Sequence, residues 1–201
     1  MAWQSPIAPG VSWYQETIAE RPDYPTMDGS RTVDVAIIGG GFTGLQAAYN
    51  LARAGIAVTL IEAHRFGDGA SGRNGGQFGT GQRAWPDELE EKIGFERSKA
   101  LFDLAENAKH YVLDFARDNQ IDMEFQPGQL NVSHKRAYEK SYRDSVEAMV
   151  GRYGYEQIAF MEKAETADRL GSSHYHCGVR DTGTGHIHPL KLLVGLAKAA
   201  K

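Results

Sequence analysis

The pattern of apolar and polar residues is most informative between residues 33 and 62, where it predicts a strand, a helix and a second strand. Residues 33–38 form an apolar run rich in β-branched side chains, which favours a strand buried on both faces of a parallel sheet. Gly55 is placed to end the helix, and the apolar run 57–61 predicts the second strand. The helix between them has apolar residues at helical spacing, namely Leu45, Ala48, Leu51 and Ala52.

Weaker patterns divide the rest of the chain. Residues 1–32 are typical of an extended arm that docks aromatic side chains on the main body, and they carry Pro6, Pro9, Pro22, Pro25, Trp3, Trp13, Tyr14 and Tyr24. Periodicity then predicts a helical region from Pro86 through Phe115, two short strands in 124–132 around a Pro127-Gly128 turn, a helix over 138–149, a short helix over 164–170, a strand over 175–180 and a helix from Pro189.

Composition narrows the class of protein. The chain has 201 residues, of which 41% are hydrophobic, enough for one ordinary core or two small ones. Its net charge of -4 gives no reason to expect a nucleic-acid partner. The single cysteine, Cys177, excludes an internal disulfide and fits a reducing compartment. No apolar run reaches membrane-spanning length and the N-terminus does not read as a secretory signal, so we expect a cytoplasmic protein.

The spacing of glycines adds chemistry to the predicted strand–helix–strand unit. Gly39 allows a sharp turn into the helix, Gly41 lets the backbone approach a pyrophosphate, and Gly44 lets the helix pack closely on the strand. The helix N-terminus offers N–H groups and the positive end of its dipole to phosphates. Glu62 follows about 20 residues later, the position of an acid that binds a ribose hydroxyl. These residues predict a dinucleotide site, and Glu62 disfavours a 2′-phosphate and therefore NADP.

A glycine-rich stretch, residues 63–81, follows the second strand. It is too long for a simple connector, and loops of this size in compact domains are often functional. The alternative interpretation is a flexible surface loop. We favour a binding loop, because such loops sit on rigid scaffolds.

These segments resemble a known family. The chain resembles the FAD-dependent amine and amino-acid oxidases related to D-amino-acid oxidase. The resemblance lies in the G-G-G-F-T-G segment at 39–44, in Gly55, Glu62 and Ala63, and in the G-A-S-G-R-N-G-G-Q run at 69–77. The gamma-glutamylputrescine oxidoreductase branch is most similar, because its members carry a segment before the glycine motif that is matched by Ser12, Trp13 and Tyr14. Residues 185–199 resemble the point where such chains return from the substrate domain to the FAD domain.

The resemblance implies FAD as cofactor and an amine or amino acid, such as a gamma-glutamylputrescine-like compound, as substrate. Hydride would pass from a C–H beside the amine to flavin N5, and the resulting imine would hydrolyse. The resemblance names no catalytic residue in this chain, because the family's candidates lie beyond Lys201. It implies a cofactor-binding set, which is Gly39, Gly41, Phe42, Thr43, Gly44, Glu62, Ala63, Ser71, Gly72, Arg73, Asn74, Gly75 and Gly76.

The expected fold is α/β, an FAD-binding Rossmann-type βαβ unit with an inserted, mostly helical substrate-domain segment, incomplete at the C-terminus. The expected domains are an arm over 1–32, the βαβ unit and glycine-rich loop over 33–85, the inserted segment over 86–184 and a truncated return helix over 185–201. The last helix has no visible stop, and two parallel strands do not make a self-sufficient sheet. We therefore expect an N-terminal portion of a larger protein, or a chain that needs a second chain.

Other interpretations stay open at this point. An NAD-linked dehydrogenase would use the same glycine motif, although the loop at 69–77 argues against it. A truncated, non-catalytic chain would retain the motif without activity. His174, His176, Cys177, His186 and His188 gather within fifteen residues, but their spacing matches no zinc pattern, so we predict no metal site.

Overall fold

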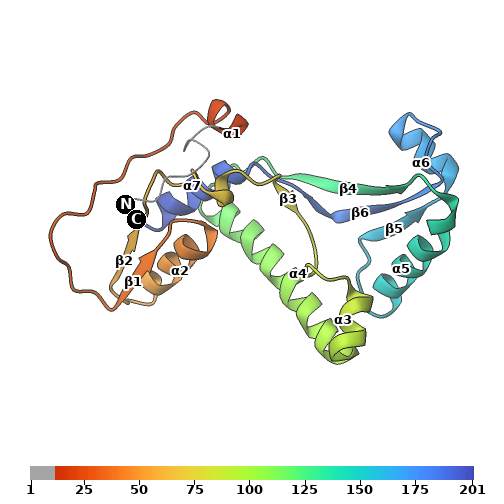
Figure 1. Ribbon diagram of the computed structural model, residues 1–201, viewed down its shortest axis with the longest axis horizontal. Helices are drawn as coiled ribbons and strands as arrows, with labels where there is room; N and C mark the ends of the chain where they lie inside the picture. The colour runs from red at the N-terminus through yellow and green to blue at the C-terminus, as the bar shows by residue number, and fades with distance from the viewer. Residues whose placement is uncertain (1–11) are drawn as a thin grey trace, which may run out of the picture. The chain divides into compact units, whose positions relative to one another are not determined.

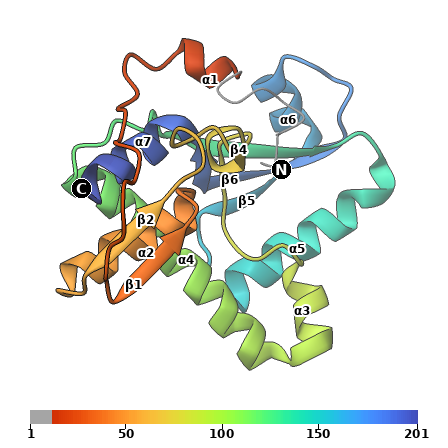
Figure 2. The ribbon, with the colours of Figure 1, turned by 60° about the vertical axis from the view of Figure 1, so that its left-hand side comes forward.

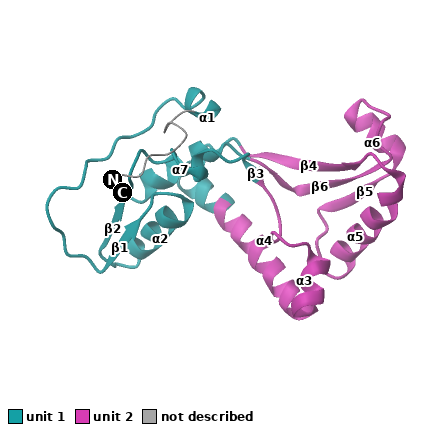
Figure 3. Cartoon of the chain, viewed as in Figure 1, with its two compact units in different colours: residues 1–77, 113–124, 187–201 teal, residues 78–112, 125–186 magenta. Residues whose placement is uncertain are grey.

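The computed structural model describes residues 12–201 and divides the chain into two compact units (Figure 3). Unit 1 comprises residues 1–77, 113–124 and 187–201, and unit 2 comprises residues 78–112 and 125–186. Trp3, Pro6 and Pro9 of the predicted arm lie outside the described residues.

The predicted βαβ unit is present in unit 1 (Figure 1). Its elements are β1 (Val35–Ile38), α2 (Phe42–Arg53) and β2 (Val58–Ile61). The two strands pair in parallel, with Val35 opposite Val58. Gly55 follows the helix with a φ of 79°, a left-handed conformation that glycine adopts without steric cost. The hydrophobic pattern therefore predicted this part of the chain correctly.

The core of unit 1 lies where α2 meets α7 (Pro189–Ala199), and Figure 2 shows both beside the two parallel strands. Pro189 begins α7, and the ring of His188 caps it, because its Nδ1 accepts a hydrogen bond from the backbone N–H of Lys191 at 3.1 Å. The end of α4 (Phe95–Asp118) joins the same core. The buried core residues are Leu45, Phe115, Leu193, Leu196 and Ala197.

The described part of the arm begins with a single helical turn, α1 (Trp13–Glu16), and continues without regular structure to β1. The ring centroid of Tyr14 lies 4.9 Å from that of His188, and Tyr24 meets Phe66 edge to face at 4.8 Å. The docking predicted for these two tyrosines is therefore confirmed. It is wrong for Trp13, whose side chain is 76% exposed, because neighbouring residues of a helical turn point in different directions.

The expectation that the first strand has two buried faces is also wrong for this chain. β1 alternates half-buried and exposed residues, and Ile38 is 90% exposed. Its partner Ile61 is exposed as well. A strand is buried on both faces only where other elements cover both, and the described residues leave these two positions open.

Unit 2 is built on an antiparallel sheet. Its long strand β6 (Cys177–His186) pairs with β4 (Gln126–Ser133), β5 (Ile158–Met161) and the short β3 (Gln77–Phe78). The other elements of this part of the chain are α3 (Pro86–Ile93), the first part of α4, a 3₁₀ turn η2 (Arg136–Tyr138), α5 (Glu139–Gly151) and α6 (Lys163–Leu170). The sheet and helices enclose a second core around Phe102, Tyr153 and Tyr155.

Three predictions for unit 2 need correction. Residues 124–132 do not form two strands around a turn, because Pro127 and Gly128 lie within one continuous strand, β4, at the point where its register with β6 shifts. The helical region from Pro86 is two helices, separated at Gly94, whose φ is 79°. Strand β5 was not predicted at all, and β6 extends to His186, beyond the strand predicted to end at Arg180.

The two compact units divide the chain differently from the expected domains at three places. Residues 78–85 and 185–186 lie in unit 2, and residues 113–124 lie in unit 1. The functional assignment of the expected domains stays a prediction. No helix within residues 12–201 is long and apolar enough to cross a membrane.

Candidate functional site

The glycine turn after β1 is held by the packing of unit 1 itself. Gly39 has a φ of 103°, and its N–H donates to the carbonyl of Ile61 at 2.8 Å. A Cβ on Gly44 would stand 2.0 Å from the carbonyl oxygen of Gly39 and 3.3 Å from Ile37 Cγ2. A side chain at Gly44 would therefore push α2 away from β1, which is the close helix–strand packing predicted for this position.

The next two glycines face the loop that follows β2. A Cβ on Gly40 would come within 2.1 Å of the Phe66 ring, and one on Gly41 would come within 2.9 Å of Ser71 Oγ. Sequence reasoning assigned a role to Gly41 but missed Gly40 and Phe66. The run of three glycines at 39–41 was the available signal, since one turn seldom needs three.

The N-terminus of α2 meets the glycine-rich loop directly. Gly41 is the N-cap residue and supplies no side-chain cap, and the N–H of Phe42 donates to Ser71 Oγ at 3.2 Å. Ser71 lies in a 3₁₀ turn, η1 (Ala70–Gly72). The positive end of the helix dipole and a hydroxyl that can both donate and accept thus lie together, an arrangement suited to a phosphate oxygen.

Glu62 closes the same site from the end of β2. Its Oε2 accepts a hydrogen bond from the N–H of Gly40 at 2.6 Å, and its Oε1 accepts one from the N–H of His64 at 3.1 Å. The carboxylate is half-buried, so it keeps an accessible side. A carboxylate has about four acceptor positions, which leaves capacity for hydroxyl groups of a ligand.

The glycine-rich loop is folded rather than open. Asn74 organises it, because its Nδ2 donates to the carbonyl of Ser71 at 3.0 Å and its Oδ1 accepts from the N–H of Gly76 at 2.9 Å. Gly72 is buried, and a Cβ there would stand 2.1 Å from the carbonyl oxygen of Gly67. Gly76 exchanges a backbone hydrogen bond with Ile187, whose N–H donates to Gly76 O at 2.8 Å.

The predicted site residues therefore separate into those that touch and those that only lie nearby. The structure joins Gly41, Phe42 and Ser71 at the helix N-terminus, and it joins Glu62 to this region through Gly40. Arg73 follows η1 directly, and its N–H donates to the carbonyl of Ala70 at 3.1 Å. Exposed positions in the same segments are Thr43, Ala63, Asn74 and Gly75.

A buried ion pair ties the arm to the loop and was not predicted. Arg21 Nη2 lies 2.7 Å from Asp68 Oδ1 and donates to the carbonyl of Phe66, also at 2.7 Å. Both charged side chains are 6% exposed. Since Phe66 stacks against Gly40, the pair supports the wall of the glycine turn.

His188 joins the arm to α7. Its Nε2 lies 3.0 Å from Thr17 Oγ1, while its Nδ1 caps the helix. Burial lowers the pKa of its imidazole below the ordinary value of 6.5; the nearby charge of Glu124 opposes this shift, and that of Lys191 adds to it. Of the other residues in the histidine and cysteine cluster, Cys177 is a buried free thiol in unit 2. Within residues 12–201 no group of three or more His, Cys, Asp and Glu side chains is arranged to hold a metal ion.

Residues 34–201 match the profile of the family described as DAO, FAD dependent oxidoreductase. The chain belongs to this family. FAD is the family's cofactor and oxidation–reduction is its chemistry, which confirms the predicted family, cofactor and reaction class and leaves an NAD-linked dehydrogenase without support.

Curated relatives agree with the family. The chain is 68% identical over 200 residues to the probable oxidoreductase OrdL of Rhizobium meliloti (strain 1021), covering 100% of this chain and 47% of the relative. It is 32% identical over 190 residues to the gamma-glutamylputrescine oxidoreductase of Escherichia coli (strain K12), covering 94% of this chain and 44% of the relative. The chain thus spans about half the length of these relatives.

Solved structures of low sequence identity share the fold. An L-amino acid deaminase from Proteus myxofaciens superimposes with a TM-score of 0.70 at 20% identity, over 90% of this chain and 39% of that one. A glycine oxidase from Bacillus cereus ATCC 14579 superimposes with a TM-score of 0.61 at 21% identity, over 84% of this chain and 44% of that one. These similarities confirm the α/β fold class.

Proposed function

We propose that the glycine turn, Glu62 and the loop at residues 71–76 hold FAD in a protein that oxidises an amine or an amino acid. When bound, FAD supplies the chemistry by accepting a hydride at its N5 from the carbon beside the amine. The observation that carries the proposal is the meeting of three segments at one place, through the Phe42–Ser71 and Gly40–Glu62 hydrogen bonds.

The residues fit this cofactor in chemistry and in space. The N-terminus of α2 and the Ser71 hydroxyl would bind the pyrophosphate, with Gly41 letting it approach the backbone. Glu62 would accept hydrogen bonds from a ribose hydroxyl, and its charge would repel a 2′-phosphate. Residues 71–76 would line the remainder of FAD, where Gly75 leaves open space. We assign no catalytic residue within the chain.

The finer parts of the proposal concern the whole protein. A gamma-glutamylputrescine-like amine is the proposed substrate, supported by the similarity to the oxidoreductase of that name. The relatives are about twice as long as this chain, so we assign turnover to a protein of that length or to this chain with a second one. We propose a cytoplasmic location, because the only cysteine is a free thiol.

The test first removes any retained flavin from the purified chain. The chain is then titrated with FAD, and binding is followed by flavin fluorescence. Glu62→Gln keeps an acceptor for the Gly40 N–H but loses the charge, and it should weaken FAD binding about tenfold, as expected for a charge-assisted hydrogen bond. The matched control is Glu91→Gln, an exposed carboxylate of α3 that should bind FAD normally.

A second pair of variants separates binding from folding. Gly75 and Gly151 both have open space where a Cβ would be built, so neither Gly75→Ala nor Gly151→Ala should alter thermal stability appreciably. Only Gly75→Ala should weaken FAD binding. A chain that retains no flavin and ignores added FAD, or a Glu62→Gln variant with normal affinity, would refute the proposed site. The first result would favour the non-catalytic interpretation.

A further inference from the structure

Unit 2 contains an open cleft that is separate from the proposed flavin site. Its volume is about 320 Å³, within the range of small-molecule pockets. It lies between one face of the antiparallel sheet, the helices α4 and α5, and the loop at residues 79–86. All of its lining residues belong to unit 2, whereas the glycine turn and Glu62 belong to unit 1.

Polar residues of the sheet form the floor of this cleft. Gln129 of β4 pairs directly with Asp181 of β6, so both side chains lie on one face, and Asn131 follows two residues later on that face. Within residues 12–201 neither amide side chain makes a hydrogen bond. A side-chain amide can both donate and accept, so the floor offers a ligand both kinds of hydrogen bond.

Asp181 is held in place by its neighbours and keeps one oxygen for a ligand. Its Oδ1 accepts hydrogen bonds from Tyr155 Oη at 2.6 Å and from the N–H of Gly183 at 2.9 Å. Burial, and then the hydrogen bond to Asp181, raise the pKa of Tyr155, so the phenol stays neutral and acts as the donor. Both hydrogen bonds that Asp181 accepts from the described residues go to Oδ1, so Oδ2 is available to a hydroxyl donor.

The register shift between β4 and β6 brings a further polar group to the cleft. Between the pairs Gln129–Asp181 and Pro127–Gly185, β4 has one residue and β6 has three. In a regular strand residues 181 and 184 would face opposite sides, yet Thr184 lines the same cleft as Asp181. Thr184 is 4% exposed and its hydroxyl oxygen is buried without a hydrogen-bond partner, which costs free energy unless a ligand or a water supplies one.

The charges that line the cleft have opposite signs. Asp181 is the acid and Arg83 the base among its lining residues. An ammonium group can only donate hydrogen bonds and a carboxylate can only accept them, so either ion would use half of the polar groups on the floor. A neutral ligand with several hydroxyl groups, each of which donates and accepts, would use all of them.

An exposed tryptophan lines the same cleft. Trp85 is 66% exposed, although an indole carries a large apolar surface. It is the N-cap residue of α3, but its side chain makes no capping hydrogen bond. Neither packing nor capping therefore accounts for an indole at this position. The face of an indole is negative and attracts the C–H bonds of a saturated ring, as found in a sugar.

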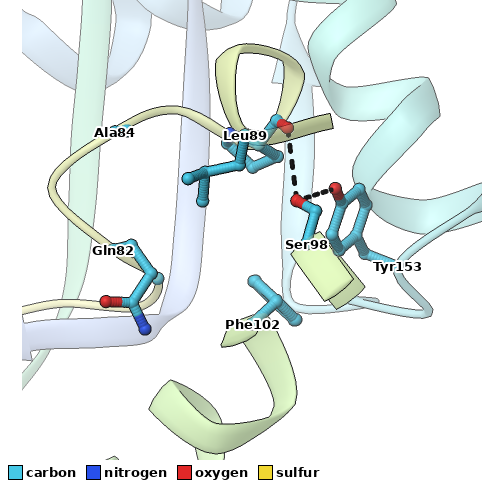
Figure 4. Close-up of a pocket in the computed structure, with 8 residues that line it drawn as sticks. Gln82, Ala84, Leu89, Ser98, Phe102 and Tyr153 are labelled. Carbon is cyan, nitrogen blue, oxygen red and sulfur yellow. Dashed lines mark hydrogen bonds between the residues drawn. The ribbon is translucent and has the colours of Figure 1, made fainter. Parts of the chain in front are cut away.

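The loop that carries Trp85 is fixed at both ends. Lys109 Nζ donates to Thr80 Oγ1 at 2.7 Å. At the other end Ser98 Oγ donates to the carbonyl of Pro86 at 3.3 Å, beside a cavity of about 10 Å³ that has room for one water at most (Figure 4). Because the loop is anchored on α4 before a ligand arrives, less conformational freedom is lost on binding.

We propose that the cleft of unit 2 binds a neutral pyranose sugar, with Asp181 and Thr184 bonding its hydroxyl groups and Trp85 covering one face of its ring. The free amides of Gln129 and Asn131 supply further donors and acceptors. The site needs neither flavin nor an amine, so the proposal goes beyond the proposed function and does not depend on it.

The test titrates methyl β-D-glucopyranoside into the full 201-residue chain without flavin and follows the NMR signal of the Trp85 indole N–H, assigned with Trp85→Phe. Tetrahydropyran, the same ring without hydroxyl groups, and n-butylamine, a charged donor, are the comparison probes. The glucoside should bind at least about tenfold more tightly than either, because only it can both donate to Asp181 and accept from the amides.

Variants of the floor test the hydrogen bonds. Asp181→Asn keeps an acceptor for Tyr155 and Gly183 but loses the charge, and it should weaken glucoside binding about tenfold. Asp168→Asn removes an exposed carboxylate of α6 and should leave binding unchanged. Thr184→Val preserves the shape of the side chain, so it should weaken binding without loss of thermal stability.

A matched pair of tryptophan variants tests the ring contact, with binding measured by calorimetry. Trp85→Ala should weaken glucoside binding about three- to tenfold, whereas Trp13→Ala, which removes an indole that is 76% exposed in unit 1, should not. The proposal is overturned if the glucoside does not bind, if it binds no more tightly than tetrahydropyran or butylammonium, or if Asp181→Asn and Trp85→Ala bind it as the unmodified chain does.

Discussion

Replacing Arg21 by alanine should destabilise unit 1 by about 3 kcal/mol. The Arg21 and Asp68 side chains are each 6% exposed, and their closest nitrogen and oxygen atoms lie 2.7 Å apart. Removing one partner of a buried pair costs about 3–5 kcal/mol, because the remaining charge stays buried without its counter-charge. We expect the lower end of this range, since Asp68 Oδ2 still accepts a hydrogen bond from the N–H of Arg65 at 3.3 Å.

The same chain offers a matched control on the same two segments. Arg65 Nε lies 3.0 Å from Asp23 Oδ1, but these side chains are 49% and 83% exposed. An exposed pair contributes about 0–1 kcal/mol, so Asp23→Ala should be nearly neutral. The Arg21→Ala, Asp68→Ala double variant should recover part of the loss, because it removes the stranded carboxylate together with the guanidinium.

Urea unfolding measures these costs, and hydrogen exchange of the β1 and β2 amides shows whether the loss falls in unit 1. Without urea, the Arg21→Ala variant should still fold but bind FAD more weakly. Phe66 forms the wall beside Gly40, and in this variant its carbonyl loses the hydrogen bond from Arg21. If Arg21→Ala costs no more than Asp23→Ala, the reasoning about burial is wrong.

Three further predictions concern single residues. Gly44→Ala should lower the unfolding free energy of unit 1 by at least about 1–3 kcal/mol through overpacking against Gly39, whereas Gly69→Ala, with open space and a φ of -85°, should be harmless in the same urea assay. The pKa of His188 is lower in the folded chain than in the unfolded chain, so its contribution to stability is complete above the unfolded-state pKa of about 6.5 and falls as the pH drops below that value. His188→Asn should flatten that part of the curve of unfolding free energy against pH. An unchanged slope would contradict the role of His188. Burial raises the pKa of the Cys177 thiol, so maleimide should label it much faster in urea than in the native chain, and equal rates would contradict its burial.

The parts of the fold that the sequence predicted are those encoded over short distances. The turn at Gly39, the packing of Gly44 and the position of Glu62 follow from local chain geometry, and all three appear as expected. Helices α5, α6 and α7 were likewise visible from apolar spacing. The family resemblance, rather than periodicity, named Ser71 and the other loop residues, whose role in binding FAD stays a prediction.

The missed features depend on partners distant in sequence. Arg21 and Asp68 are 47 residues apart, and each alone is an ordinary polar residue. Strand β5 has only four residues and follows a glycine-containing turn, so only its pairing with β6 identifies it as a strand. The same holds for the Pro127-Gly128 pair, whose sequence favours a turn but which continues strand β4 when β6 is beside it.

The glycines of the fingerprint show how far folding alone accounts for a binding motif. The fold itself requires glycine at positions 44 and 72. A Cβ on Gly44 would lie 2.0 Å from a backbone oxygen, and a Cβ on Gly72 would lie 2.1 Å from one. Gly39 needs its glycine for a φ of 103°. Gly75 has neither reason, because it is exposed, has open space around it and lacks a positive φ. A ligand close to the backbone is a physical reason for a small residue there, so Gly75 bears more directly on cofactor binding than the glycines that define the motif.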